Sequence, residues 1–137
     1  MKKLLLLLVA TMLCLILIVG CASQNKPDKT SDRMYGLGLT ALEIIDEYLD
    51  GKTSLENAME NFSSIADDIG DQYENSKREA GVEALGGTDY ANDSSISMEV
   101  VFLDYRLMER SYGTGTDSEI LEYRNRLAEN LNKSNRK

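Results

Sequence analysis

Residues 31–62 read SDRMYGLGLTALEIIDEYLDGKTSLENAMENF, and this stretch decides the fold because it holds two helical patterns separated by a turn. In the first pattern, apolar residues recur every three or four positions, which is the repeat of one face of an α-helix. Gly51 follows the pattern and suits the left-handed conformation that often ends a helix. The apolar stripe consists of Met34, Leu37, Ala41, Ile45 and Tyr48, widened by Leu42 and Leu49.

The second helical pattern begins at Thr53-Ser54-Leu55-Glu56, which has the spacing of a capping box. In that motif a hydroxyl and a carboxylate accept hydrogen bonds from backbone N–H groups that have no partner inside the helix. Two helices joined by so short a turn predict an antiparallel hairpin. Gly70, at a cost of about 1 kcal/mol relative to alanine, indicates a kink or a close helix contact. The second apolar stripe consists of Leu55, Met59, Phe62, Ile65 or Ala66, Ile69 and Tyr73.

The rest of the chain predicts two more helices. The pattern weakens over residues 74–83 and ends at Gly86-Gly87, and the polar residues 88–95 predict a mobile loop. A third helix is expected over about residues 95–110, and a fourth after a second capping-box motif, Thr116-Asp117-Ser118-Glu119. We therefore predict an all-α protein, a small antiparallel bundle of about four helices over residues 31–132 with a frayed tail at 133–137. The inward residues of the last helix are expected to be Ile120, Tyr123 or Arg124, Leu127 and Leu131.

The first residues of the chain predict a targeting signal. Lys2 and Lys3 precede an apolar run from residue 4 to 19, and Leu17-Ile18-Val19-Gly20-Cys21 closes it. This ending resembles the lipobox of bacterial lipoproteins, and the resemblance covers residues 1–24. It implies cleavage between Gly20 and Cys21 and a diacylglycerol bonded to the Cys21 thiol. Residues 22–30 are polar, contain the only proline and show no helical repeat, so residues 21–30 are predicted to form the lipidated cysteine and a flexible tether. The alternative is an uncleaved membrane helix, but the 16 residues from 4 to 19 fall short of the roughly 20 that span a bilayer.

Composition limits the classes of function. The chain has a net charge of −8, and the predicted signal contains two of its lysines and none of its acids. A negative domain repels phosphate backbones, so nucleic acid is not an expected partner. Histidine is absent, and of the two cysteines Cys14 lies within the signal and Cys21 is the predicted lipidation site. The usual general bases, thiol nucleophiles and zinc ligands are therefore missing, and no enzyme activity is expected.

Carboxylates remain as candidate ligands. Asp67, Asp68 and Asp71 lie three or four positions apart on one helix flank, where they are weak candidates to hold a divalent cation, with Tyr73 as a further contact for a small ligand. Calcium prefers six to eight oxygens, usually supplied by a loop, so a solvated acidic face is the favoured interpretation and no metal is expected. Gly113-Thr114-Gly115-Thr116 before a helix offers amides to an anion, but a simple helix-helix turn explains it as well.

The third helix has two apolar stripes. One consists of Ile96, Val100, Leu103 and Leu107, and the other, on nearly the opposite side, of Met98, Val101, Phe102, Tyr105 and Met108. The favoured interpretation is a central helix covered on both sides. The alternative is that Met98, Phe102, Tyr105 and Met108 are exposed and form an interface for a partner, since thioethers and aromatic rings are common at binding surfaces.

Together these features predict a lipoprotein held at the cell membrane on its extracytoplasmic face. We expect a non-catalytic binding module whose partner is another envelope or secreted protein, with no cofactor apart from the diacylglycerol on Cys21. The alternative function is the binding of a small ligand or a divalent cation by the helical bundle.

Overall fold

The computed structural model describes residues 25–83 and 90–137. The described residues form four α-helices, α2 (Asp32–Leu49), α3 (Leu55–Glu83), α4 (Ala91–Ser111) and α5 (Asp117–Asn130), and contain no strand. This confirms the predicted all-α bundle. None of these helices is long and apolar enough to cross a membrane. Gly20 and Cys21, the predicted cleavage and lipidation site, lie outside the described residues.

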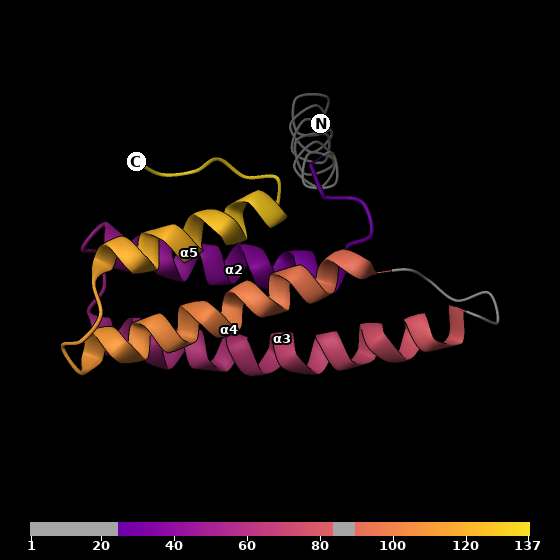
Figure 1. The fold of residues 1–137 in the computed structure, drawn as a ribbon, viewed down its shortest axis with the longest axis horizontal. Coiled ribbons are helices and arrows are strands. Elements are labelled where there is room, and N and C mark those ends of the chain that lie inside the picture. Colours follow the sequence, from indigo (N-terminus) through magenta and orange to yellow (C-terminus); the bar gives the residue numbers. More distant parts are fainter. Residues whose placement is uncertain (1–24, 84–89) are drawn as a thin grey trace, which may run out of the picture.

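The helices form an up-and-down bundle in which each runs antiparallel to the one before it (Figure 1). α2 packs against α3 and α5, and α4 also packs against α3 and α5, so the four helices close into a ring, with further contacts between α2 and α4. The start of α2 and the start of α4 lie at one end of the bundle. The two short turns, α2 to α3 and α4 to α5, lie at the other end.

The core is built from the stripes that the sequence predicts. Every helix contributes fully buried side chains, and the largest are Phe62, Met34, Ile45, Ile69, Ile96, Leu103, Leu107, Ile120, Leu127 and Leu131. Gly38, not Gly70, marks a close helix contact: a Cβ at Gly38 would lie 2.9 Å from Cδ2 of Leu131, whereas a Cβ at Gly70 would meet nothing within 4 Å. The expectation of a close contact at Gly70 is therefore wrong, because Gly70 lies on the solvent side of α3.

The ends of the helices follow capping rules, with one shift from the prediction. Thr116 and Glu119 form the predicted capping box at the start of α5. Gly51 and Gly113 end α2 and α4 with φ of 69° and 75°, a conformation that glycine adopts without steric cost. At the start of α3 the cap is Ser54, whose Oγ accepts a hydrogen bond from Asn57 N at 3.2 Å. The capping box predicted for Thr53 and Glu56 is therefore wrong: a single cap hydrogen bond to Ser54, one residue later, begins the helix.

Helix α4 begins at Ala91, within the segment predicted to be a mobile loop. Hydrogen bonds of the Asp93 side chain hold this segment against the other helices. Asp93 is fully buried. Its Oδ1 accepts a hydrogen bond from Ser31 N at 2.9 Å, and its Oδ2 accepts from Ser31 Oγ at 2.7 Å and Ser76 Oγ at 2.5 Å. Gln72 Nε2 donates to both serine hydroxyls, at 3.3 and 3.1 Å. Residues 91–95 are helical, and the loop prediction was wrong for them.

Lys29 and Thr30, which precede the N-cap of α2, are hydrogen-bonded to Asn92 of α4. Asn92 Nδ2 donates to Thr30 Oγ1 at 2.9 Å and to the Asn130 carbonyl at 3.0 Å, and the Asn92 N–H donates to the Lys29 carbonyl at 3.0 Å. The predicted tether is thus fixed to α4 and α5 over residues 29 and 30.

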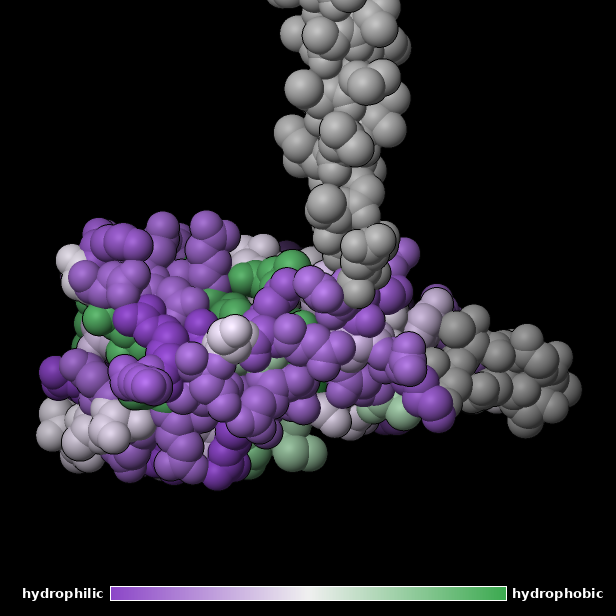
Figure 2. All heavy atoms as spheres, turned by 90° about the horizontal axis from the view of Figure 1, so that it is seen from above, coloured by the Kyte–Doolittle hydropathy of each residue, from purple (hydrophilic) through white to green (hydrophobic). Residues whose placement is uncertain are grey.

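The C-terminal tail is not helical, but it does not fray. It turns back along α5 (Figure 1), where Asn125 exchanges two hydrogen bonds with the backbone of Arg136, at 2.8 and 2.9 Å. The Arg136 side chain donates to Asp46 Oδ1 at 3.0 Å and to Asp50 Oδ1 at 2.5 Å. The frayed tail predicted for 133–137 is therefore corrected: charge pairing with α2 holds it in place. From the side of α5 and this tail, the surface is mostly hydrophilic (Figure 2).

Candidate interaction surface on helix α4

Helix α4 has one buried and one exposed apolar side. The stripe of Ile96, Val100, Leu103 and Leu107 is buried against the other helices. The second stripe is exposed, which corrects the favoured interpretation of a central helix: α3 and α5 flank α4, and no described element lies over its outer side. We call the exposed residues the outer α4 face; they are Met98 (55% exposed), Val101 (63%), Phe102 (41%), Tyr105 (47%), Met108 (39%) and Tyr112 (75%).

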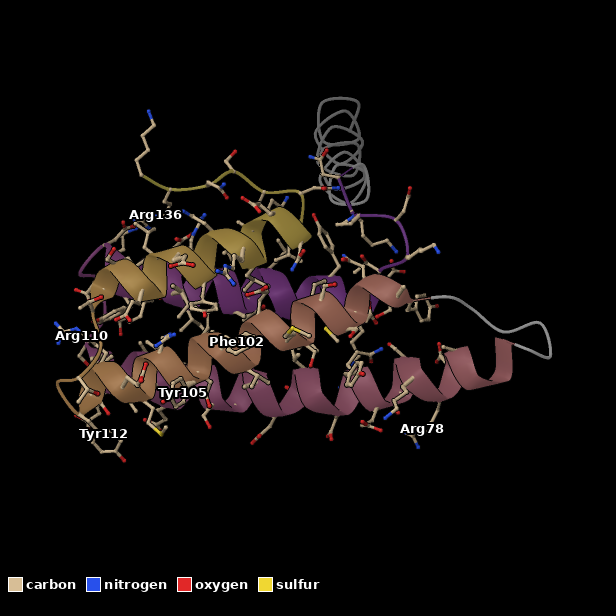
Figure 3. The ribbon with its side chains drawn as sticks, in the orientation of Figure 1. Arg78, Phe102, Tyr105, Arg110, Tyr112 and Arg136 are labelled. Carbon is tan, nitrogen blue, oxygen red and sulfur yellow. The ribbon has the colours of Figure 1, made fainter. Side chains whose placement is uncertain are left out.

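The outer α4 face extends along most of the helix. Figure 3 shows Phe102, Tyr105 and Tyr112 projecting from α4 one after another along its length. At its C-terminal end the face adjoins a hollow of about 380 Å³ lined by Leu55, Glu56, Met59 and Ser111. The structure therefore brings together the four residues predicted as an interface and adds Val101 and Tyr112 to them.

One border of the face is formed with α5 and is aromatic and cationic. The rings of Phe102 and Tyr123 lie 5.3 Å apart between centroids. The guanidinium groups of Arg126 and Arg106 lie 4.7 and 5.2 Å from the Tyr123 ring centroid, within the range of cation–π attraction. Both arginines already have carboxylate partners: Arg106 lies 2.5 Å from Glu109, and Arg126 lies 2.6 Å from Glu122.

Each border of the face has a partly buried carboxylate whose negative charge is not balanced by an ion pair with a described residue; these carboxylates belong to Glu99 and Asp104. On the α5 side, Oε2 of Glu99 is buried without a hydrogen-bond partner. Burial raises the pKa of Glu99, the charge of Glu129 adds to this, and Arg126 opposes it. On the α3 side, partial burial and then the charge of Asp67 raise the pKa of Asp104. A positive charge placed beside Glu99 or Asp104 would stabilise the ionised form of that carboxylate. Nε of Arg106, on the α5 side, is also buried without a hydrogen-bond partner.

The predicted cation ligands do not form a site. Asp67, Asp68 and Asp71 are all exposed on α3, and in residues 25–83 and 90–137 no three acidic, histidine or cysteine side chains lie together as a metal site would require. Tyr73 is half-buried against the core. No observation favours cation or small-ligand binding, which stays an untested prediction.

The turn before α5 offers no amides to an anion. The N–H groups of Gly113, Thr114 and Gly115 donate to carbonyls of Arg110 and Glu109, and the Thr116 N–H donates to Glu119 Oε2. These bonds satisfy the local backbone, so the segment is a helix-helix turn.

Sequence reasoning missed the contribution of α5 to this surface. It left Tyr123 and Arg124 as alternatives for one inward position. The structure buries Arg124 in a two-point ion pair with Asp46, with both N–O distances 2.9 Å, and places Tyr123 beside Phe102. The available signal was Asp46, a carboxylate within the apolar stripe region of α2 that needs a cationic partner when its surroundings are packed.

Fold and surface together define a small four-helix bundle with one exposed apolar helix face. Comparison of the chain with protein-family models, curated proteins and solved structures finds no match. The function is therefore argued from the chain's own residues.

Proposed function

We propose that this protein is a lipid-anchored lipoprotein of the cell envelope that acts without catalysis, by binding another envelope or secreted protein through the outer α4 face. The anchor rests on the lipobox-like residues 17–21 and the cationic, apolar stretch before them. The binding role rests on one observation, the exposure of five large apolar side chains along α4 and of its C-cap residue Tyr112. Contiguous exposed apolar surface of this kind is typical of sites that another molecule covers.

The composition of the face supports protein binding. Methionine and aromatic residues are enriched at interfaces, where thioethers adapt to a partner and rings add large contact areas. Full burial of such a side chain contributes about 1.5–3 kcal/mol. Because Met98, Phe102 and Met108 are already about half-buried, a partner recovers roughly half of that for each.

The attachment of the chain leaves this face accessible. Residues 29–31 are bonded to α4 and enter the bundle at the end where α2 and α4 begin. The outer α4 face lies along the side of the bundle, from near that end towards the α4–α5 turn (Figure 3). A protein on the same side of the membrane as the anchored bundle could therefore contact the outer α4 face directly.

The anchor is tested by Cys21→Ala. The expected result is loss of lipid attachment and of signal processing, read by membrane fractionation, and insensitivity to globomycin, which blocks lipoprotein signal peptidase. A variant that is still processed and membrane-bound would overturn the lipoprotein assignment.

The binding surface is tested by photo-crosslinking in intact cells. A photoreactive amino acid at position 102 is compared with one at position 43, because Glu43 is exposed on α2, away from the outer α4 face. We expect a discrete crosslinked protein from position 102 and none from position 43. Equal labelling at both positions, or labelling at neither, would overturn the proposal.

A further inference from the structure

The outer α4 face also indicates the chemistry of its partner. Building on the proposed function, we propose that the face binds a cationic amphipathic helix of another protein, whose apolar side lies on Met98 to Tyr112 and whose Lys or Arg side chains lie beside Glu99 and Asp104.

The shape of the face fits a helix. Its residues recur at positions 98, 101, 102, 105, 108 and 112, which is the repeat of one helical face, and they extend over about 21 Å at a rise of 1.5 Å per residue. A helix of about four turns covers that length. The hollow beside Ser111, lined by Leu55 and Met59, would accept a large apolar side chain at one end of such a helix.

Apolar contact alone does not account for binding. Association costs translational and rotational freedom, and this cost is comparable with what these half-buried side chains recover. Charge contacts at the border of the face therefore have to contribute. The sign of the charges at the border of the face therefore determines which partner can bind.

The carboxylates of Glu99 and Asp104 form no ion pair with the described residues, whereas Arg106, whose Nε is also buried without a hydrogen-bond partner, is paired with Glu109. Glu99 has an oxygen without a hydrogen-bond partner, and Asp104 lies near Asp67, a second carboxylate. The nearby arginines are already occupied, Arg106 by Glu109 and Arg126 by Glu122. An incoming ammonium or guanidinium group would stabilise the charge of Glu99 and reduce the repulsion between Asp104 and Asp67, whereas an incoming carboxylate would add to that repulsion.

The same charges disfavour two other occupants. A second copy of this chain would bring another net charge of −8, and an anionic lipid surface would repel the same carboxylates. A cationic protein segment is the occupant that satisfies both the apolar stripe and its borders.

The test uses the full chain in nanodiscs of zwitterionic lipid, with empty nanodiscs as the blank. The probe is a fluorescent synthetic peptide of leucine and lysine arranged as an amphipathic helix, and the comparison peptide has glutamate in place of lysine. The border variant Glu99→Gln with Asp104→Asn is matched by Glu43→Gln with Glu47→Gln, which removes the same charge from exposed positions on α2. A third protein, Phe102→Ser with Tyr105→Ser, tests the apolar stripe.

We expect the lysine peptide to bind and the glutamate peptide not to bind. The border variant should weaken binding by about tenfold at about 0.15 M salt, where exposed charges beyond about 8 Å are screened. The matched α2 variant should weaken it less than about threefold, and the stripe variant should weaken it at least as much as the border variant. Equal weakening by the border and α2 pairs would show attraction by net charge alone and would overturn this inference.

Two further outcomes separate this inference from the proposed function. A dimer of the wild-type chain that Phe102→Asp dissolves, measured by mass photometry, would show that a second copy covers the face and would overturn the cationic partner. Crosslinking from position 102 to a protein segment that lacks basic residues would do the same while supporting the proposed binding role. Absence of that crosslink would overturn the binding role itself.

Discussion

The carboxylate of Asp93 accepts hydrogen bonds from both the backbone N–H and the hydroxyl of Ser31, a residue 62 positions earlier in the chain, at 2.9 and 2.7 Å. Ser31 is the N-cap of α2, and Asp93 lies in the first turn of α4. One buried side chain thus places negative charge at the N-terminal ends of two helices, where their dipoles stabilise it. This contact fixes the end of the bundle at which the predicted tether enters.

Asp93→Ala is expected to destabilise the bundle by about 2–4 kcal/mol, because it leaves the Ser31 and Ser76 donors buried without an acceptor. Asp93→Asn should cost less, because an amide can accept from Ser31 N–H through its oxygen and donate to the serine hydroxyls, which can rotate. The measurement is urea unfolding of the full chain in mild detergent, followed by circular dichroism. Equal stability of Asp93→Ala and the wild type would contradict the assigned role.

Two glycines on α2 form a matched pair. Gly38→Ala places a methyl group 2.9 Å from buried Leu131, whereas Gly36→Ala places one in open space. Gly36→Ala should stabilise α2 by about 0.5–1 kcal/mol through helix propensity. Gly38→Ala should be less stable than Gly36→Ala by about 1–2 kcal/mol because of overpacking. Melting temperatures in the opposite order would show that α2 and α5 do not meet at this point.

The ion pair between Asp46 and Arg124 predicts a dependence of stability on pH. Burial raises the pKa of Asp46, but hydrogen bonds from Arg124 and Arg136 outweigh it and bring the pKa below its ordinary value of 3.8. A carboxyl whose folded pKa is depressed stabilises the fold above its unfolded pKa, and this contribution is lost as the pH falls through the folded pKa. The free energy of unfolding of the wild type should therefore exceed that of Asp46→Asn near neutral pH.

The difference between wild type and Asp46→Asn should shrink as the pH is lowered below about 4. Asp68→Asn, which removes one carboxylate at an exposed position on α3, serves as the control. A gap between wild type and Asp46→Asn that stays constant from neutral to strongly acidic pH would argue against the ion pair.

For Glu99 we expect the opposite effect of ionisation on stability from that of Asp46. Because burial raises its pKa, ionisation of Glu99 opposes folding as the pH rises through the folded pKa. Glu99→Gln should therefore raise the melting temperature at neutral pH while it weakens binding of the cationic peptide. A fall in melting temperature would mean that Glu99 has a structural partner and is not reserved for binding.

The helices and the core could be predicted because their signals are local. The spacing of Met34, Ala41 and Ile45 and the Thr116–Glu119 box depend on residues a few positions apart, and the structure confirms them. Ser54 in place of Thr53 shows the limit of such motifs, since both hydroxyls precede the same helix and only its first turn decides between them.

The errors arose where distant residues decide the outcome. Asn92 and Asp93 are polar and predict a loop, but their partners are Thr30 and Ser31, the two residues that precede α2. The apolar repeat reveals the second stripe of α4, but it does not show whether a neighbouring helix covers that stripe. Whether Tyr123 or Arg124 is buried was left open because the deciding residue, Asp46, lies 78 positions from Arg124.

The most direct test of the outer α4 face replaces Phe102 and Met108 together by aspartate and measures the neighbours recovered by crosslinking on intact cells. We expect the double variant to fold with a melting temperature near that of the wild type and to lose the neighbour captured by the wild-type protein. Unfolding of the variant would show that these side chains belong to the core, and a folded variant with unchanged neighbours would show that binding takes place elsewhere.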